Sequence, residues 1–243
     1  MAHRAPRIKF CGITGLDDAQ RAVDAGAWAI GMILWPGSAR AIDQGQASRI
    51  SNALRRKVEI AGVFVNQPLD EVTALADVLN LGLIQLHGDE GPSYANEIAR
   101  RTGAKVIKAQ SVRLASDIVA VQAYRTDFHL LDAHREGLRG GTGETFDWTM
   151  LSHRHSKVPL ILSGGLHPGN VAEAIDAVRP FAVDVASGVE SAPGIKDPDK
   201  LEAFAAAVRG TADEPDHDPV EHEPPEPAPA AAQRPVPRRP ASA

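Results

Sequence analysis

The chain contains little of what disulfide-bonded, metal-thiolate or membrane-embedded proteins require. Its 243 residues include one cysteine, Cys11, so no disulfide forms within the chain and no thiolate cluster can hold a metal. No apolar run approaches the length of a membrane-spanning helix, and the N-terminal residues lack the long apolar segment of a signal peptide. We therefore expect a cytoplasmic protein that does not contact membranes.

Positive charge is also scarce. Lysine and arginine number 26 against 31 aspartates and glutamates, and the formal net charge of −5 offers no basic surface to nucleic acid. The chain is otherwise ordinary, with 43% hydrophobic and 23% charged residues, as in many globular proteins. Its length fits two small domains or one larger α/β barrel, so the order of the elements must decide between them.

Short apolar runs alternate with longer amphipathic segments from Ile8 to about Arg209. This alternation is typical of parallel strand-helix-strand units. Eight such units in about 200 residues favour a single (β/α)₈ barrel, an α/β fold, over an open sheet, which more often has five to seven strands. The eight predicted strands are residues 8–11, 29–34, 60–65, 83–86, 106–109, 128–131, 160–162 and 182–185.

Three glycines follow predicted helices and mark where these should end. Gly26, Gly82 and Gly103 each stand where a residue with positive φ can terminate a helix. The strand-helix units are therefore expected to have local boundaries.

The composition changes after Gly210, where acidic residues, proline and alanine replace large apolar side chains. Such a segment buries too little surface to offset the entropy cost of ordering it. We expect a barrel domain over residues 1–210 and a disordered tail over 211–243. The simpler interpretation of the tail is a solvated extension, and the alternative is a docking segment for an unknown partner.

Reactive residues of a (β/α)₈ barrel lie at the C-terminal ends of its strands, and phosphate usually binds after strands seven and eight. Glycines gather there: Gly140 to Gly143 after the sixth predicted strand, Gly164 and Gly165 after the seventh, and Gly188 beside Ser187 after the eighth. Glycine lets backbone N–H groups approach an anion closely, so three such loops could hold one phosphate. Alternatively, these glycines only make tight turns.

Four side chains at the same ends are candidates for chemistry or substrate binding. Cys11 ends the first strand, where a lowered thiol pKa would make it a nucleophile or base, although most free cysteines are simply buried. Asp132 ends the sixth strand and is either a general acid or a helix N-cap. Arg40 could bind a carboxylate or lie on the surface, and His87 could orient substrate or fill the core. The remaining histidines form no ligand-like group, so we expect no metal.

These segments together resemble phosphoribosylanthranilate isomerase, over residues 8 to about 209. The matching motifs occur in the family's order: Lys9-Phe-Cys-Gly-Ile-Thr14, Ser38-Ala-Arg40, Gly62-Val-Phe64, Gln85-Leu-His-Gly88, Leu131-Asp132, Gly140-Gly-Thr-Gly143 with Phe146-Asp-Trp148, Ser163-Gly-Gly-Leu166, Asp184-Val-Ala-Ser-Gly-Val-Glu190 and Gly194-Ile-Lys-Asp197. Ala39 stands where the family usually has proline, and Ala186 where it usually has serine. Both departures concern ligand geometry rather than the reaction.

The resemblance implies a (β/α)₈ enzyme without a cofactor that performs an Amadori rearrangement of N-(5-phosphoribosyl)anthranilate in tryptophan biosynthesis. It implies that Cys11 is the general base, that Asp132 is the general acid and that Arg40 holds the anthranilate end. The candidate substrate-binding residues are Arg40, His87, Gly141, Thr142, Gly143, Gly164, Gly165, Asp184, Ser187 and Gly188.

Two other functions stay open from the sequence. One is a related bifunctional isomerase that also acts in histidine biosynthesis, although those enzymes carry aspartate at the position of Cys11. The other is a binding protein that keeps the phosphate site without catalysis, which the presence of both Cys11 and Asp132 disfavours.

Overall fold

The structure is a computed structural model that describes residues 4–132, 150–151 and 154–212. The predicted phosphate loop at residues 140–143, with Gly141, Thr142 and Gly143, lies outside these residues. The motif at residues 146–148 and all but the first two residues of the predicted tail also lie outside them.

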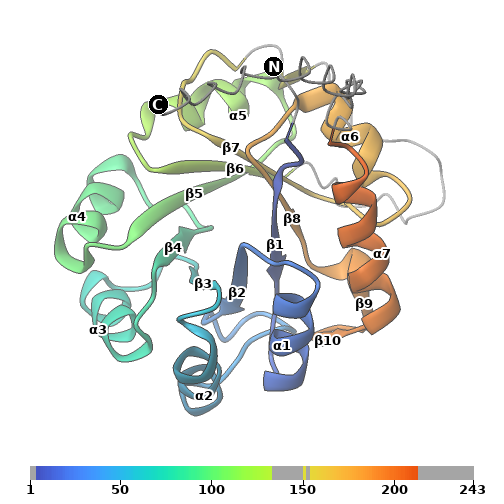
Figure 1. Cartoon of the computed structure of the whole chain (residues 1–243). Helices are drawn as coiled ribbons and strands as arrows, with labels where there is room; N and C mark the ends of the chain where they lie inside the picture. The colour runs from blue at the N-terminus through green and yellow to red at the C-terminus, as the bar shows by residue number, and fades with distance from the viewer. Residues whose placement is uncertain (1–3, 133–149, 152–153, 213–243) are drawn as a thin grey trace, which may run out of the picture.

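Eight parallel strands close into a barrel in sequence order, with the last strand pairing to the first (Figure 1). Their bounds are β1 Arg7–Cys11, β2 Ala29–Ile33, β3 Glu59–Phe64, β4 Leu83–Leu86, β5 Lys105–Ser111, β6 Phe128–Asp132, β7 Leu160–Ser163 and β8 Ala182–Val185. The predicted (β/α)₈ fold is confirmed. Each predicted strand overlaps an observed one, and β4 and β8 match to the residue.

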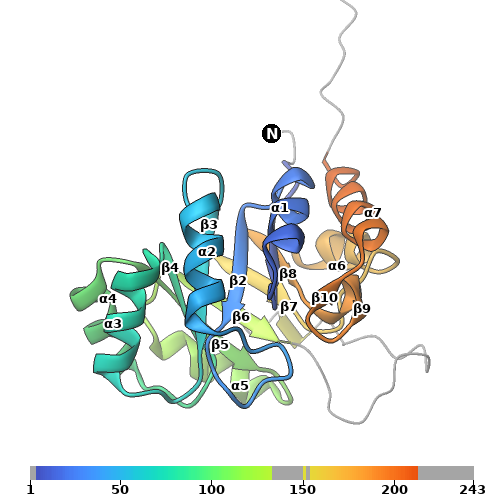
Figure 2. The same cartoon turned by 90° about the horizontal axis from the view of Figure 1, so that it is seen from below.

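Helices surround the ring of strands on its outer face (Figures 1 and 2). Those described are α1 Leu16–Asp24, α2 Gln44–Leu54, α3 Leu69–Leu79, α4 Pro92–Thr102, α5 Ala115–Ala120, α6 Val171–Val178 and α7 Pro198–Arg209. Within the described ranges, no helix combines the length and apolar character needed to cross a membrane. Helix α7 ends one residue before Gly210, and the division of the chain into domains at that point stays a prediction.

Alternate residues of each strand belong to different parts of the core. In β1, Ile8 and Phe10 pack outward under the helices, where Phe10 meets the ring of Phe204 in α7. Lys9 and Cys11 must therefore face the barrel interior, because successive side chains of a strand point to opposite faces. Both are buried.

Interior positions change character along the barrel axis. Near the N-terminal ends of the strands they are apolar, as at Ala29, Leu83 and Phe128. Two or four residues further along the same faces stand Gln85 and Asp132. The polar residues are thus collected at the C-terminal end of the barrel, where the fold places active sites.

Two local features differ from the sequence expectations. Helix α3 ends at Leu79, and the next residue, Asn80, has the left-handed conformation that was expected of Gly82, with φ of 48°. The prediction for Gly82 is therefore wrong. Asparagine tolerates this conformation better than most residues because its short side chain can hydrogen-bond locally. The expectation holds for Gly103, with φ of 68°, and Gly26 has φ of 94° just beyond α1.

An antiparallel hairpin follows β8 and was not foreseen. It consists of β9 Glu190–Ala192 and β10 Ile195–Lys196, preceded by a short 3-10 helix, Ser187–Val189. Gly194, with φ of 80°, occupies the turn. The hairpin brings Glu190 and Lys196 back over the C-terminal end of β1.

Candidate active site

The thiol of Cys11 lies inside the C-terminal end of the barrel. In the sheet, Cys11 of β1 is paired with Gly31 of β2. A Cβ added to Gly31 would stand 2.8 Å from the sulfur of Cys11 and 3.1 Å from Nζ of Lys9. Gly31 therefore leaves the gap into which both groups project. Burial raises the pKa of the Cys11 thiol, and the charge of Lys9 offsets this only in part.

Lys9 forms an ion pair with Asp184 across the barrel interior. The Nζ of Lys9 donates to Oδ1 of Asp184 at 2.7 Å, and the hydroxyl of Ser163 donates to Oδ2 of the same carboxylate at 3.1 Å. Burial disfavours the charge on Lys9, but Asp184 and Cys11 outweigh it, so the pKa of the Lys9 ammonium is raised. Three adjacent strands, β7, β8 and β1, are connected through this carboxylate.

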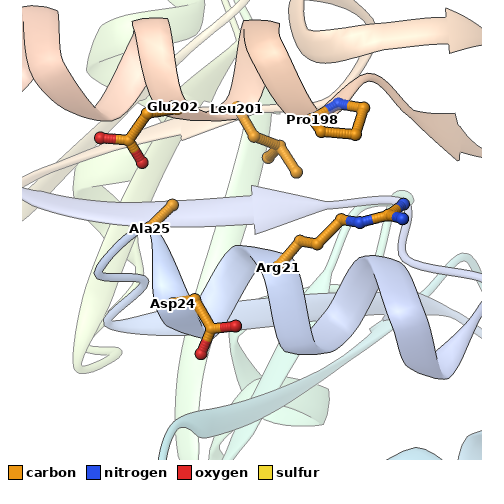
Figure 3. Close-up of a pocket in the computed structure, with 6 residues that line it drawn as sticks. All are labelled: Arg21, Asp24, Ala25, Pro198, Leu201 and Glu202. Atoms are coloured by element: carbon orange, nitrogen blue, oxygen red, sulfur yellow. The ribbon is translucent and has the colours of Figure 1, made fainter.

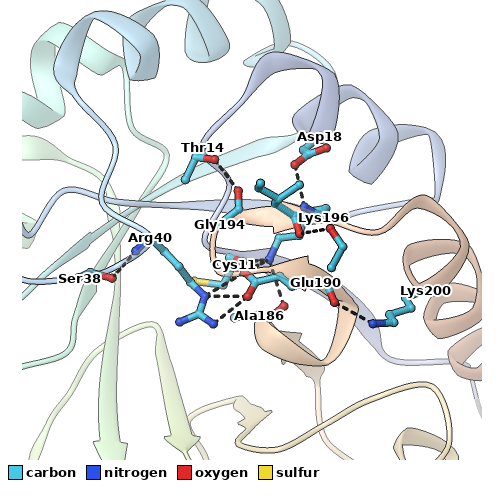
Figure 4. A network of polar contacts seen from close by, with 12 residues as sticks. Cys11, Thr14, Asp18, Ser38, Arg40, Ala186, Glu190, Gly194, Lys196 and Lys200 are labelled. Carbon is cyan, nitrogen blue, oxygen red and sulfur yellow. Dashed lines mark hydrogen bonds and ion pairs between the residues drawn. The ribbon is translucent and has the colours of Figure 1, made fainter.

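A second cluster of charges lies between the loop after β2 and the hairpin (Figure 4). Arg40 donates through Nε and Nη2 to both carboxylate oxygens of Glu190, at 2.7 to 3.0 Å. Lys196 donates to the same carboxylate and to the main-chain oxygens of Cys11 and Ala186. The aliphatic part of Arg40 passes over Gly12, where an added Cβ would stand 2.8 Å from its Cδ. Arg40 is thereby held next to Cys11.

The ionisation of this cluster follows from its contacts. Hydrogen bonding to Glu190 raises the pKa of Arg40, and burial lowers that of Lys196. Burial opposes the charge of Glu190, but its bonds to Arg40 and Lys196 prevail and its pKa is lowered. Glu190 occupies Nε and Nη2 of Arg40, and no hydrogen bond within the described part of the chain involves Nη1, which can therefore bind a further anion.

His87, which directly follows β4, and Asp132, the last residue of β6, lie close together at the barrel mouth. The Nε2 of His87 is 3.7 Å from Oδ2 of Asp132, and the amide nitrogen of Gln85 is 3.1 Å from Nδ1 of His87. Since that amide can only donate, Nδ1 accepts and Nε2 carries the proton that points to Asp132. Burial lowers the pKa of His87, although Asp132 and Asp184 oppose the shift, so the imidazole is neutral at pH 7.

The two described glycine loops lie side by side at this end of the barrel. Gly164 and Gly165, after β7, have φ of 98° and 65°, a conformation that favours glycine. A Cβ at Gly188, after β8, would collide with the main-chain oxygen of Leu166. The neighbouring Ser187 is exposed. These glycines therefore make turns that side chains would disrupt, and they leave main chain accessible at the mouth.

The structure gathers most of the sequence candidates at one end of the barrel: Cys11, Arg40, His87, Asp132, Gly164, Gly165, Asp184, Ser187 and Gly188. The sequence interpretation missed Lys9, Gln85, Glu190 and Lys196. Lys9 had a readable signal, because a lysine two positions before Cys11 in an apolar strand must share its face. Glu190 and Lys196 needed the hairpin.

A shallow pocket on the outside of the barrel lacks a cluster of reactive groups like the one at the barrel mouth. It lies between α1 and α7 and is lined by Arg21, Asp24, Ala25, Pro198, Leu201 and Glu202 (Figure 3). Arg21 pairs with Asp18, and Glu202 pairs with Arg209. Among the residues that the structure describes, no group of three histidine, cysteine, aspartate or glutamate side chains could hold a metal ion.

Comparison with known proteins gives a consistent result. Residues 8–207 match the family model described as N-(5'-phosphoribosyl)anthranilate (PRA) isomerase. The N-(5'-phosphoribosyl)anthranilate isomerase of Citrifermentans bemidjiense is 44% identical over 203 residues, which cover 84% of this chain and 97% of that protein. The enzyme of Chromohalobacter salexigens is 46% identical over 208 residues, 84% of this chain and 95% of that one.

Solved structures agree with these relatives. Phosphoribosyl anthranilate isomerase from Thermotoga maritima superimposes with a TM-score of 0.77 at 42% identity, covering 84% of this chain and 99% of that chain. A second structure, of a phosphoribosyl anthranilate isomerase in complex with reduced 1-(o-carboxyphenylamino)-1-deoxyribulose 5-phosphate, has a TM-score of 0.74 at 41% identity and covers the same shares.

Proposed function

This chain belongs to the N-(5'-phosphoribosyl)anthranilate isomerase family and is an aldose-ketose isomerase of tryptophan biosynthesis, and we propose that Cys11 and Asp132 are its general base and general acid. The observation that carries the proposal is the convergence of the two groups on the interior of the barrel mouth from β1 and β6. His87 is next to Asp132, with its Nε2 3.7 Å from Oδ2, and the charges of Asp132, Asp184 and Lys9 act on its imidazole.

The first step opens the furanose ring. Asp132 gives its proton to the ring oxygen, the C1–O bond breaks, and the lone pair of the anthranilate nitrogen forms a protonated Schiff base at C1. The neutral imidazole of His87 can donate its Nε2 proton toward the carboxylate that Asp132 becomes. Asp132 has to be protonated at the start of each cycle.

The second step moves a proton from C2. The Cys11 thiolate takes this proton, and the electrons of the C–H bond form the C1–C2 double bond and neutralise the Schiff base to an enolamine. The enolamine then gains a proton at C1 and loses one from its C2 hydroxyl, which gives the ketone. General acid and base groups of this kind contribute about 10²- to 10⁴-fold each.

Binding is assigned to the two ends of the substrate. The free Nη1 side of Arg40 suits the anthranilate carboxylate, while Glu190 holds the guanidinium in place. The loops with Gly164, Gly165, Ser187 and Gly188 suit the phosphate, and the segment 140–143 stays a proposal from the sequence. His87 and Asp184 were also expected to bind substrate. The carboxylate of Asp184 is engaged by Lys9 and Ser163, so its proposed contribution is to the site's electrostatics.

The test uses the fluorescence of the anthranilate group. Freshly made phosphoribosylanthranilate is mixed with the native chain and with Cys11→Ala, and the fluorescence change that accompanies conversion is followed. Rapid conversion by the native chain and none by the variant is expected. Near-native turnover by a folded Cys11→Ala would remove the cysteine from the mechanism.

A further inference from the structure

Lys9 is a fully buried lysine inside the barrel, in a position that the reaction above does not use. Lysine is almost never completely buried unless it is paired, and here the Nζ of Lys9 donates to Asp184 at 2.7 Å. The ion pair lies within the barrel rather than at its surface, so its desolvation costs free energy that a pair of apolar residues would avoid. A purely structural connection between β1 and β8 does not require charge at this position.

The location of Lys9 relative to Cys11 suggests what the charge does. Both side chains point from β1 into the barrel interior, two residues apart, and both project toward the gap left by Gly31. One added carbon at Gly31 would be in close contact with the ammonium nitrogen and the sulfur at once. An ammonium group this near favours the thiolate over the thiol.

We propose that Lys9 is a positioning residue that stabilises the thiolate of Cys11, with Asp184 and Ser163 holding the ammonium group in place. The proposal rests on the role of Cys11 as the base. A buried thiol without a cation beside it would stay protonated and could not accept a proton from carbon. Gly31 serves the same purpose, because a side chain there would force the ammonium and the thiol apart.

Other charges face Cys11 from the elements around it, and their contacts distinguish them from Lys9. The groups are Asp184 from β8, Lys196 from β10 and Arg40 from the loop after β2. Glu190 from β9 is bound by both Arg40 and Lys196, and His87 after β4 is next to Asp132 of β6. Lys196 binds three oxygens and Arg40 binds Glu190. Of the surrounding charges, that of Lys9 favours the Cys11 thiolate most strongly, ahead of the opposing influence of Asp184.

The test is a titration of the thiol in the full-length chain. Since Cys11 is the only cysteine, the thiolate absorbance measured against Cys11→Ser reports this residue alone. Lys9→Met should move the midpoint to higher pH by about one unit or more, and Asp184→Asn should move it to lower pH. The acid limb of the kcat/KM profile should move with the midpoint in Lys9→Met.

A double variant keeps the proposal falsifiable if Lys9→Met leaves Asp184 unpaired and the barrel unstable. Lys9→Met with Asp184→Asn removes both charges, and its midpoint should still lie above that of the native chain. A midpoint at or below the native value in the folded double variant would overturn the proposal. Turnover in Cys11→Ala would instead refute the role of Cys11, whatever the titration gave.

Discussion

The two ends of the barrel are lined by different kinds of side chain. At the N-terminal end of the strands, the rings of Trp28, Phe128 and Phe181 pack with centroids 5.2 to 5.5 Å apart. The guanidinium of Arg7 lies over two of these rings, 5.6 Å from the centroid of Trp28 and 4.8 Å from that of Phe181. At the C-terminal end, the interior holds Lys9 and Asp184, and charged side chains from loops surround the opening.

The difference shows where this chain places stability and where it places reactivity. Aromatic rings bury a large area, and their edge-to-face contacts add about 0.5–1.5 kcal/mol per pair. Buried charges are costly to desolvate and contribute little net stability. The charged end is therefore explained by chemistry, and the aromatic end by folding. If stability and reactivity are separated in this way, a substitution at one end should leave the property of the other end unchanged.

The largest effect is expected at the charged end, from Asp132→Asn. The amide cannot give a proton to the ring oxygen, so turnover should fall about 10²- to 10⁴-fold. The midpoint of thermal unfolding should change little, because Asp132 is only partly buried at the rim. Steady-state assays and a melting curve of the same preparation provide both values.

A much lower unfolding temperature for Asp132→Asn would contradict the separation of stability from reactivity at this residue. Asp132 would then be a structural residue whose loss of activity follows from unfolding. A matched control is Asp127→Asn, outside the barrel mouth, which keeps an oxygen to accept the hydrogen bond from the N–H of Val106 and should retain native turnover.

At the aromatic end, Phe128→Ala should reduce the free energy of unfolding by about 3–5 kcal/mol. The ring is buried and contacts Trp28 and Phe181, so its removal leaves a cavity under both. Denaturant unfolding measures the loss. The kcat of the folded fraction should remain within about twofold of native, and a tenfold fall would show that the two ends are coupled.

The sequence was sufficient for the framework because its signals are local. Apolar runs separated by amphipathic segments define the strands, and the end of each strand identifies the mouth of the barrel. Cys11 and Asp132 were found in this way. Gly82 was a wrong prediction because asparagine two positions earlier could already adopt the left-handed conformation.

The polar network could not be read in the same way. Lys9 and Asp184 are 175 residues apart, and Arg40 and Glu190 are 150 residues apart. Their pairing depends on how the closed barrel aligns β1 with β8, where Lys9 is directly opposite Asp184. The hairpin over residues 190–196 adds Glu190 and Lys196, and its strands are too short for an apolar pattern to reveal.

A smaller effect is expected from Arg40→Lys. Lysine cannot bind Glu190 through two nitrogens and still present a third to a carboxylate, so we expect KM to rise about tenfold. The value of kcat should change little, because this contact is equally present before and during the reaction. An unchanged KM would show that the anthranilate end is held elsewhere.

The smallest effect is expected from Asp43→Ala, at the start of α2. The carboxylate of Asp43 accepts a hydrogen bond from the N–H of Gln46 at 3.0 Å, and loss of such a cap costs about 1 kcal/mol of stability. Asp43→Asn keeps the cap and is the matched control. Only two residues lie between Arg40 and Asp43, so this variant also tests how sharply the charged end is separated from the framework. Denaturant unfolding should detect the loss in Asp43→Ala while KM stays native. A raised KM in Asp43→Ala but not in Asp43→Asn would mean that the start of α2 fixes the position of Arg40, and the charged end would then depend on framework contacts outside the barrel mouth.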